Sequence, residues 1–171
     1  MGYLENAKKE MQQLANILDM WFASERRSVY ALADTINHYN RKNKTHFSTC
    51  HGAVRMVIMG KDYVVKIDYS PFHAACYGGC RNEWKAYKEL KDDEYGYLLC
   101  PIHKIKIGHH FYYCMPKVEF VGEECDDNLD DFLCAEEEEW IYDHFDDLHN
   151  GNWGVLSDGQ AVLIDYAYRR G

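Results

Sequence analysis

The chain has 171 residues, a length that fits one domain with its own hydrophobic core. Apolar residues make up 47% and aromatic residues 15% of the sequence, which excludes an intrinsically disordered protein. The formal net charge of −9 argues against nucleic acid as a partner, since nonspecific binding of DNA or RNA requires a basic face.

The sequence carries no sign of export or of membrane insertion. No apolar run approaches the roughly 18 residues of a membrane-spanning helix. The first residues lack the charged start and apolar stretch of a signal peptide, which predicts a cytoplasmic protein. Seven cysteines in such a protein are typical of reduced thiols. Cys76 and Cys80, with His73 nearby, have a spacing that zinc accepts, but the second pair that a structural zinc site needs is missing.

Two helices are predicted at the start of the chain. Apolar residues recur at steps of three and four over residues 3–22, which predicts an amphipathic helix with one apolar stripe. Ser24 can cap a second helix that runs to about Tyr39, and a basic, polar loop follows at residues 40–44. We expect this pair to pack against the rest of the domain; a partner-binding helical hairpin is the alternative.

From His46 to Asp68 the pattern changes to that of strands. Residues 47–53, 54–59 and 63–67 predict a three-stranded meander with a turn at Gly60–Asp62. Lys66 lies in the third strand, where on its own it would be interpreted as a solvated lysine. A loop over residues 71–80 then precedes a helix at about residues 81–90.

Two further strands, at residues 104–107 and 111–115, are joined by a turn at residues 108–110 and complete a five-stranded sheet. Residues 122–131 are acidic, and residues 128–144 predict a helix whose glutamates at 136–139 form its solvated face.

The last part of the chain combines a hairpin with three oxygen-bearing side chains. The apolar runs 153–156 and 161–164 flank an Asp-Gly turn, which predicts a short β-hairpin. Asp147 and Asn152 precede this hairpin and Asp165 follows it. The three side chains can therefore meet at one point, where oxygen ligands suit magnesium and a carboxylate can accept a proton from a hydroxyl group. A hairpin with acidic turns and no such role is the plainer interpretation.

Asp147-x-His149-x-x-Asn152, followed by the hairpin and Ile-Asp165-Tyr, resembles the catalytic loop and metal-binding aspartate of kinase-like phosphotransferases. The family includes protein kinases and aminoglycoside phosphotransferases, and the histidine is the variant of antibiotic and choline kinases. The segment from Phe145 to Tyr166 most resembles the early serine/threonine protein kinase of T-odd bacteriophages. If the protein is encoded by a phage, as this resemblance implies, the cytoplasm in which we expect it is that of the host.

The resemblance implies an α+β, minimal protein-kinase-like fold in a single domain over residues 1–171. The helical pair would occupy residues 1–44. An N-lobe over residues 45–119 would hold the five-stranded antiparallel sheet and one helix. A truncated helical C-lobe with the catalytic-loop hairpin would occupy residues 120–171.

The same resemblance implies ATP and Mg as cofactors. Lys66, in a strand that resembles Val-Ala-Ile-Lys, would contact the α- and β-phosphates and act in catalysis together with Asp147. Glu83, seventeen residues further on, would hold the lysine, with Glu89 as the alternate; Glu83 could instead stabilise only its own helix dipole, by about 0.3–1 kcal/mol. Asn152 and Asp165 would hold the metal.

Two more residues would complete the nucleotide site. Gly52 would let backbone amides approach phosphate, although the Gly-x-Gly-x-x-Gly pattern of protein kinases is reduced to this one glycine. The segment 115–119 sits where the family has its hinge. Pro116 lacks a backbone donor, so Val118 would supply the hydrogen bond to adenine.

Two departures from the family shape the functional expectation. Phe145 and Asp146 stand where protein kinases have His-Arg before the catalytic aspartate, and only six residues follow Asp165. We therefore expect no activation segment. The expected acceptor is a hydroxyl group of a host protein or of the chain itself, while the histidine variant equally suits small-molecule acceptors. A homodimer could supply the surface that a short C-lobe lacks. The alternatives are a pseudokinase-like binding module and a host-takeover interaction protein without phosphotransfer.

Overall fold

The computed structural model describes residues 2–25, 27–52, 55–69, 79–120, 133–146 and 148–167, with only the backbone at residues 120 and 150. The chain divides into two compact units, each with its own sheet. The first unit contains residues Met1–Cys80 and Ile102–Lys117. The second contains residues Arg81–Pro101 and Val118–Gly171.

The first unit begins with helices that differ from the predicted pair. The prediction of one continuous helix over residues 3–22 is wrong, because a 3-10 turn, η1 (Gln12–Leu14), separates α1 (Gly2–Met11) from α2 (Ala15–Ala23). In a 3-10 turn, side chains three residues apart are aligned. Here the turn aligns Met11 with Leu14, and both side chains are fully buried.

The next helix, α3 (Val29–Asn43), starts and ends later than predicted. Ser28, not Ser24, is its cap: the Ser28 hydroxyl accepts a hydrogen bond from the Ala31 backbone N–H at 3.3 Å. The Trp21 indole N–H donates to the Ser28 carbonyl at 3.0 Å, which fixes the cap against α2. The helix ends at Asn43, four residues beyond Tyr39, and its C-cap, Lys44, is in the left-handed conformation.

The predicted five-stranded antiparallel sheet is confirmed. Its strands lie in the order β1-β2-β3-β5-β4, and each neighbouring pair is antiparallel. They are β1 (Ser48–His51), β2 (Arg55–Met59), β3 (Tyr63–Asp68), β4 (His103–Ile107) and β5 (His110–Pro116). One helix, α5 (Cys80–Leu90), follows β3 in the chain before β4 begins, as the predicted kinase-like arrangement requires.

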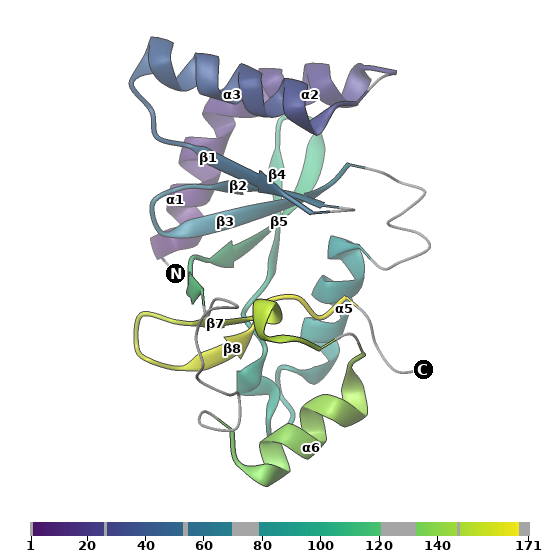
Figure 1. Cartoon of the computed structure of the whole chain (residues 1–171). Coiled ribbons are helices and arrows are strands. Elements are labelled where there is room, and N and C mark those ends of the chain that lie inside the picture. Colours follow the sequence, from purple (N-terminus) through teal and green to yellow (C-terminus); the bar gives the residue numbers. More distant parts are fainter. Residues whose placement is uncertain are drawn as a thin grey trace. The chain divides into compact units, whose positions relative to one another are not determined.

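The three N-terminal helices cover one face of this sheet (Figure 1). Tyr63, Val65 and Ile67 of β3 belong to the same buried core as Leu18, Leu32 and other apolar residues of the helices. Successive side chains of a strand point to opposite faces, so Val64 and Lys66 lie on the face away from the helices. Lys66 pairs in register with Val57 of β2 and Tyr113 of β5.

The β4–β5 turn is anchored to α2 by one carboxylate. Gly108 has φ +57°, and a Cβ atom at this position would lie 2.6 Å from a carboxylate oxygen of Asp19. The neighbouring His109 backbone N–H donates to Asp19 Oδ1 at 3.2 Å. Glycine is required here both by the left-handed backbone and by the close approach of Asp19.

The second unit holds most of α5, the 3-10 turn η2 (Gly96–Leu98) and a three-stranded sheet in the order β6-β7-β8. The strands are β6 (Glu119–Phe120), β7 (Trp153–Val155) and β8 (Ala161–Leu163). The sequence did not predict β6, which pairs with β7 through only two residues.

Helix α6 (Ala135–His144) starts later than the predicted start at residue 128. Residues 128–132 of the predicted helix lie outside the described parts of the chain. The Glu137 side chain accepts from the Cys134 backbone N–H at 2.7 Å, a capping box that sets the observed start. Among the helices of the described segments, none has the combined length and apolar character that crossing a membrane would require.

Candidate active site

The predicted hairpin before Asp165 is confirmed, and it lies within the second unit. Trp153 pairs with Leu163, and Val155 pairs with Ala161. The turn is closed by a 2.9 Å hydrogen bond from the Leu156 backbone N–H to the Gln160 carbonyl. Gly159, at φ +90°, provides the left-handed residue that this turn needs.

The hairpin brings Asn152 and Asp165 to the same end of the two strands. Asn152 ends the 3-10 turn η4 (Asn150–Asn152) just before β7, and its carbonyl accepts the Ile164 backbone N–H at 2.6 Å. Its own backbone N–H donates to the His149 carbonyl at 2.9 Å, which holds the preceding loop in place. The two predicted metal ligands are therefore adjacent, since Asp165 directly follows Ile164.

Glu83 contacts the backbone on the C-terminal side of Asp165. This glutamate lies in the first turn of α5 and is fully buried. Its Oε1 atom accepts a hydrogen bond from the Tyr166 backbone N–H at 3.3 Å. The alternate, Glu89, lies on the exposed face of the same helix. Of the two glutamates, only Glu83 is thus placed beside Asp165.

Tyr166 is a positioning residue to which the sequence assigned no role. Its hydroxyl donates to the Cys100 carbonyl at 2.6 Å, and its ring meets the Phe145 ring edge-on at 5.8 Å between centroids. Burial, followed by the nearby charge of Glu83, raises the pKa of the Tyr166 hydroxyl well above its ordinary value. The available signal was its place directly after Asp165, where protein kinases carry phenylalanine.

Lys66 and Gly52 belong to the first unit. Gly52 follows β1, where its N–H donates to the Arg55 carbonyl at 2.9 Å and its carbonyl accepts the Tyr69 hydroxyl at 2.9 Å. Among the described residues, no atom lies within 4 Å of a Cβ built at Gly52. Glu83 belongs to the other unit, so its ion pair with Lys66 stays a prediction.

The strand that carries Lys66 is also linked to the beginning of α5. Both carboxylate oxygens of Asp68, two residues after Lys66, accept from the Cys80 backbone N–H, at 3.1 and 3.2 Å. The Cys80 thiol donates to Asp68 Oδ1 at 3.2 Å. A carboxylate at a helix N-terminus satisfies orphan donors and favours the dipole. Asp68 therefore caps the helix that carries Glu83, a role that the sequence alone did not predict.

Two predicted site residues keep their roles as predictions. Asp147 lies outside the described residues. The side chain of Val118, the expected hinge donor, packs against the backbone of Gly154. A Cβ atom built on Gly154 would lie 2.3 Å from Val118 Cγ2. Glycine in strand β7 thus permits the close approach of the chain just before β6.

The donor atoms fit magnesium bound together with phosphate. The described residues contain no cluster of three or more His, Cys, Asp or Glu side chains that could hold a metal by themselves. Magnesium commonly uses one or two protein oxygens and completes its shell with water and substrate phosphates. The amide oxygen of Asn152 and the carboxylate of Asp165 are ligands of this kind. His73 and Cys76, two of the possible zinc ligands, lie outside the described parts of the chain.

Comparison with known proteins adds little beyond this geometry. No protein-family model matches the chain, and no curated protein matches it. A structure of WbdD in complex with the kinase inhibitor LY294002 is similar over 74% of this chain and 32% of WbdD, with 20% identity and a TM-score of 0.46. A second structure of WbdD gives 19% identity and a TM-score of 0.39, over 74% of this chain and 33% of WbdD.

The chain thus spans about a third of the length of the WbdD structures that it resembles. Both TM-scores are below 0.5, a degree of likeness that does not bear on function. The function is inferred instead from the topology of the chain itself and from the residues around Asp165.

Proposed function

We propose that this chain is an ATP- and Mg-dependent phosphotransferase of kinase-like fold. The observation that carries the proposal is the pair of backbone hydrogen bonds on either side of Asp165. The Ile164 N–H binds the Asn152 carbonyl and the Tyr166 N–H binds the Glu83 carboxylate. Together they hold the backbone on both sides of Asp165 against Asn152 and Glu83, which supports a shared site for these three residues.

In this proposal the protein contributes position and charge. Magnesium, when bound, would neutralise the phosphate charge that develops during transfer. Asn152 and Asp165 would hold that ion, and Lys66 would orient the α- and β-phosphates. Asp147 would orient the acceptor hydroxyl and accept its proton. Phosphoryl transfer needs little covalent help from the protein, so a fixed arrangement of these groups is sufficient.

The acceptor we favour is a serine or threonine hydroxyl, on a host protein or on the chain itself. This choice is based on the resemblance of residues 145–166 to the early serine/threonine kinase of T-odd bacteriophages. The spacing of the site residues is compatible with that acceptor class, because Asp147 precedes Asn152 by the five residues that the kinase catalytic loop has.

Nucleotide binding is tested by thermal unfolding. We expect Mg-ATP at about 1 mM, well above a micromolar dissociation constant, to raise the melting temperature, because a ligand that binds only the folded state stabilises it. Asp165→Ala should abolish the shift. Asp143→Ala, an exposed aspartate on α6, is the matched control and should retain it. The absence of a shift in the unsubstituted chain would contradict the proposal.

A second candidate, a pseudokinase-like module that binds ATP without transferring phosphate, is favoured by Phe145. This residue stands where protein kinases carry histidine, and it is fully buried among Trp140, His144 and Tyr166. Incubation with labelled ATP and host lysate separates the two candidates. Label on the chain or on another protein that disappears in Asp147→Ala supports the transferase. A melting-temperature shift without any label supports the module.

A further inference from the structure

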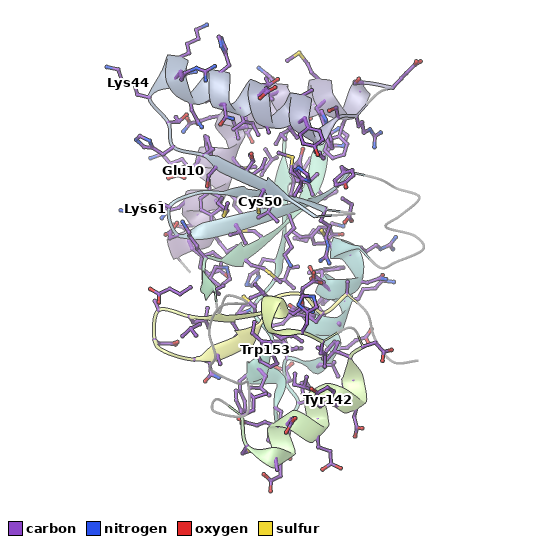
Figure 2. The ribbon with its side chains drawn as sticks, viewed as in Figure 1. Glu10, Lys44, Cys50, Lys61, Tyr142 and Trp153 are labelled. Atoms are coloured by element: carbon purple, nitrogen blue, oxygen red, sulfur yellow. The ribbon has the colours of Figure 1, made fainter. Side chains whose placement is uncertain are left out.

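A pocket of about 530 Å³ lies entirely within the first unit, and none of the candidate active-site residues lines it. Its walls come from α1, from the loop between α3 and β1, from the β2–β3 turn and from the residue after β5. Figure 2 labels Glu10 and Lys61, two of the lining residues, at the same end of this unit. The volume lies in the range of small-molecule sites, roughly 300–1,000 Å³.

Two lysines and one carboxylate, Glu10, line this pocket, and neither lysine is paired with that carboxylate. Among the described residues, neither the Lys61 nor the Lys117 ammonium group has a hydrogen-bond or ion-pair partner, and the same holds for the His46 ring. Some other lysines are engaged, such as Lys91, which pairs with Asp92, and Lys104, which lies over the Phe111 ring. In a chain of net charge −9, a pocket with two unpaired ammonium groups is a local site for an anion.

The two lysines are tied to the same turn. The Lys117 backbone N–H donates to the Asp62 carbonyl at 3.0 Å, and Asp62 directly follows Lys61 in the chain. The turn itself is closed by the Gly60 N–H, which donates to the Tyr63 carbonyl at 3.0 Å. The backbones that carry the two ammonium groups are therefore fixed relative to each other before any ligand arrives, which reduces the ordering that binding requires.

Acceptor groups and an apolar surface lie in the same pocket. The Glu10 carboxylate accepts the Tyr63 hydroxyl at 3.0 Å through Oε2, and its other oxygen has no partner among the described residues. The Thr45 hydroxyl donates to Asn40 Oδ1 at 2.8 Å, so its oxygen can still accept a hydrogen bond. Phe47 is buried and gives the lining an aromatic component. These acceptors suit hydroxyl groups on a ligand.

We propose that this pocket binds a small phosphomonoester that carries hydroxyl groups beside its phosphate. The phosphate lies at Lys61, Lys117 and His46, and the hydroxyl groups face Glu10 and Thr45. A phosphomonoester suits the pocket better than a carboxylate because it carries close to two negative charges and three strong acceptor oxygens. The pocket includes α1, which covers one sheet face, whereas Lys66 lies on the opposite face. The pocket thus shares no residue with the proposed nucleotide site.

Glycerol 3-phosphate, in the absence of ATP and magnesium, is the probe for this pocket. We expect saturable binding by calorimetry and chemical-shift changes at His46 in NMR spectra. The double substitution Lys61→Gln, Lys117→Gln should weaken binding at least about tenfold, since charge-assisted contacts to phosphate are lost. Lys106→Gln, an exposed lysine on the edge strand β4, is the matched control and should leave binding unchanged.

Two further probes separate the parts of the proposal. Inorganic phosphate should bind more weakly than glycerol 3-phosphate, and glycerol should not bind; equal affinity for inorganic phosphate would overturn the role given to the hydroxyl groups. No binding at about 10 mM, or binding that the double variant retains, would overturn the site. Asp165→Ala should bind glycerol 3-phosphate normally, so that a failure of the nucleotide proposal and a failure of this one are distinguishable.

Discussion

Tyr63 and Tyr112 are both buried in the core of the first unit, and they differ in one hydrogen bond. The Tyr63 hydroxyl donates to Glu10, whereas the Tyr112 hydroxyl has no partner among the described residues. Burial raises the pKa of both hydroxyl groups, and in Tyr63 the bond to Glu10 raises the pKa further. The same side chain therefore contributes differently to stability at the two positions.

We expect Tyr112→Phe to raise the free energy of unfolding by about 1 kcal/mol, because it removes a buried donor without changing the packing volume. Tyr63→Phe should lower it by about 1 kcal/mol through loss of the bond to Glu10. Urea unfolding followed by circular dichroism measures both differences. A loss of stability in Tyr112→Phe would contradict the inference that its hydroxyl is unsatisfied.

Tyr97 and Glu137 form a hydrogen-bonded pair in the second unit that links stability to pH. The bond to Glu137, followed by desolvation and the nearby carboxylate charge, raises the pKa of Tyr97 from 10.0 to about 12, and the same bond lowers the pKa of Glu137. A raised tyrosine pKa gives stability that is present below pH 10 and is lost as the pH rises through about 12. A lowered glutamate pKa gives stability that is present above its ordinary value and is lost on acidification.

Tyr97→Phe should therefore remove part of the pH dependence at both ends. The difference in unfolding free energy between the natural chain and the variant should be constant near neutrality. It should shrink from pH 10 to 12 and again below about pH 4.5. Unfolding midpoints in urea across this range measure the difference. A difference that does not vary with pH would show that the pair contributes nothing to linkage.

At the scale of elements, Gly96 shows how α5 is joined to the segment after it. A Cβ atom at Gly96 would lie 2.1 Å from the Leu90 carbonyl oxygen and 2.8 Å from the Lys91 carbonyl oxygen, both backbone atoms that cannot rotate away. The Gly96 N–H also donates to the Asp93 carbonyl at 3.1 Å. The chain thus folds back tightly onto the end of the helix before η2 begins.

Gly96→Ala should lower the free energy of unfolding by about 1–3 kcal/mol, the usual cost of forcing an extra methyl group into a packed site. Gly52→Ala is the matched control, because no atom of the described residues lies within 4 Å of a Cβ built there, and it should change stability by less than about 0.5 kcal/mol. Thermal and urea unfolding of the two variants give the comparison. Equal stability of both variants would mean that the turn after α5 can shift at little cost.

The local pattern of apolar residues predicted which helices and strands form. Contacts between residues that are distant in the sequence determine where each of them begins and ends. The alternation that places Met56 and Ile58 in the core is a property of five consecutive residues, so β2 could be found from sequence. Ser24 and Ser28 are equally good helix caps by type. The bond from the Trp21 indole to the Ser28 carbonyl decides between them, and that bond exists only once the helices pack.

The candidate site shows the same division. Asn152 and Asp165 could be placed together from sequence because a hairpin joins them, with Asp165 thirteen residues after Asn152. The bond from Tyr166 to Cys100 and the cap that Asp68 gives to Cys80 join residues far apart in the chain. Neither has a local signature, since a tyrosine or an aspartate at these positions has many other uses.

At the scale of the whole molecule, the excess of acidic residues has a cost. The chain has 28 acidic and 19 basic residues, which gives the formal net charge of −9. Self-repulsion of this kind opposes the compact state and is screened by salt. We expect the urea midpoint at neutral pH to rise between about 10 mM and 200 mM NaCl, where the Debye length falls from roughly 30 Å to below 10 Å. A falling midpoint would show that attractive ion pairs outweigh the repulsion.

Each of the two compact units is assembled from two separate stretches of chain, and this has a consequence for synthesis on the ribosome. Strand β3 lies between β2 and β5 in the sheet, yet β5 is made only after α5 and β4. Until residues 110–116 emerge, the nascent chain would present β3 as an open edge, the feature by which sheets pair with other chains. The hairpin that ends in Asp165 is made after α5, β4 and β5, so its contact with α5 forms only after Tyr166 has left the ribosome.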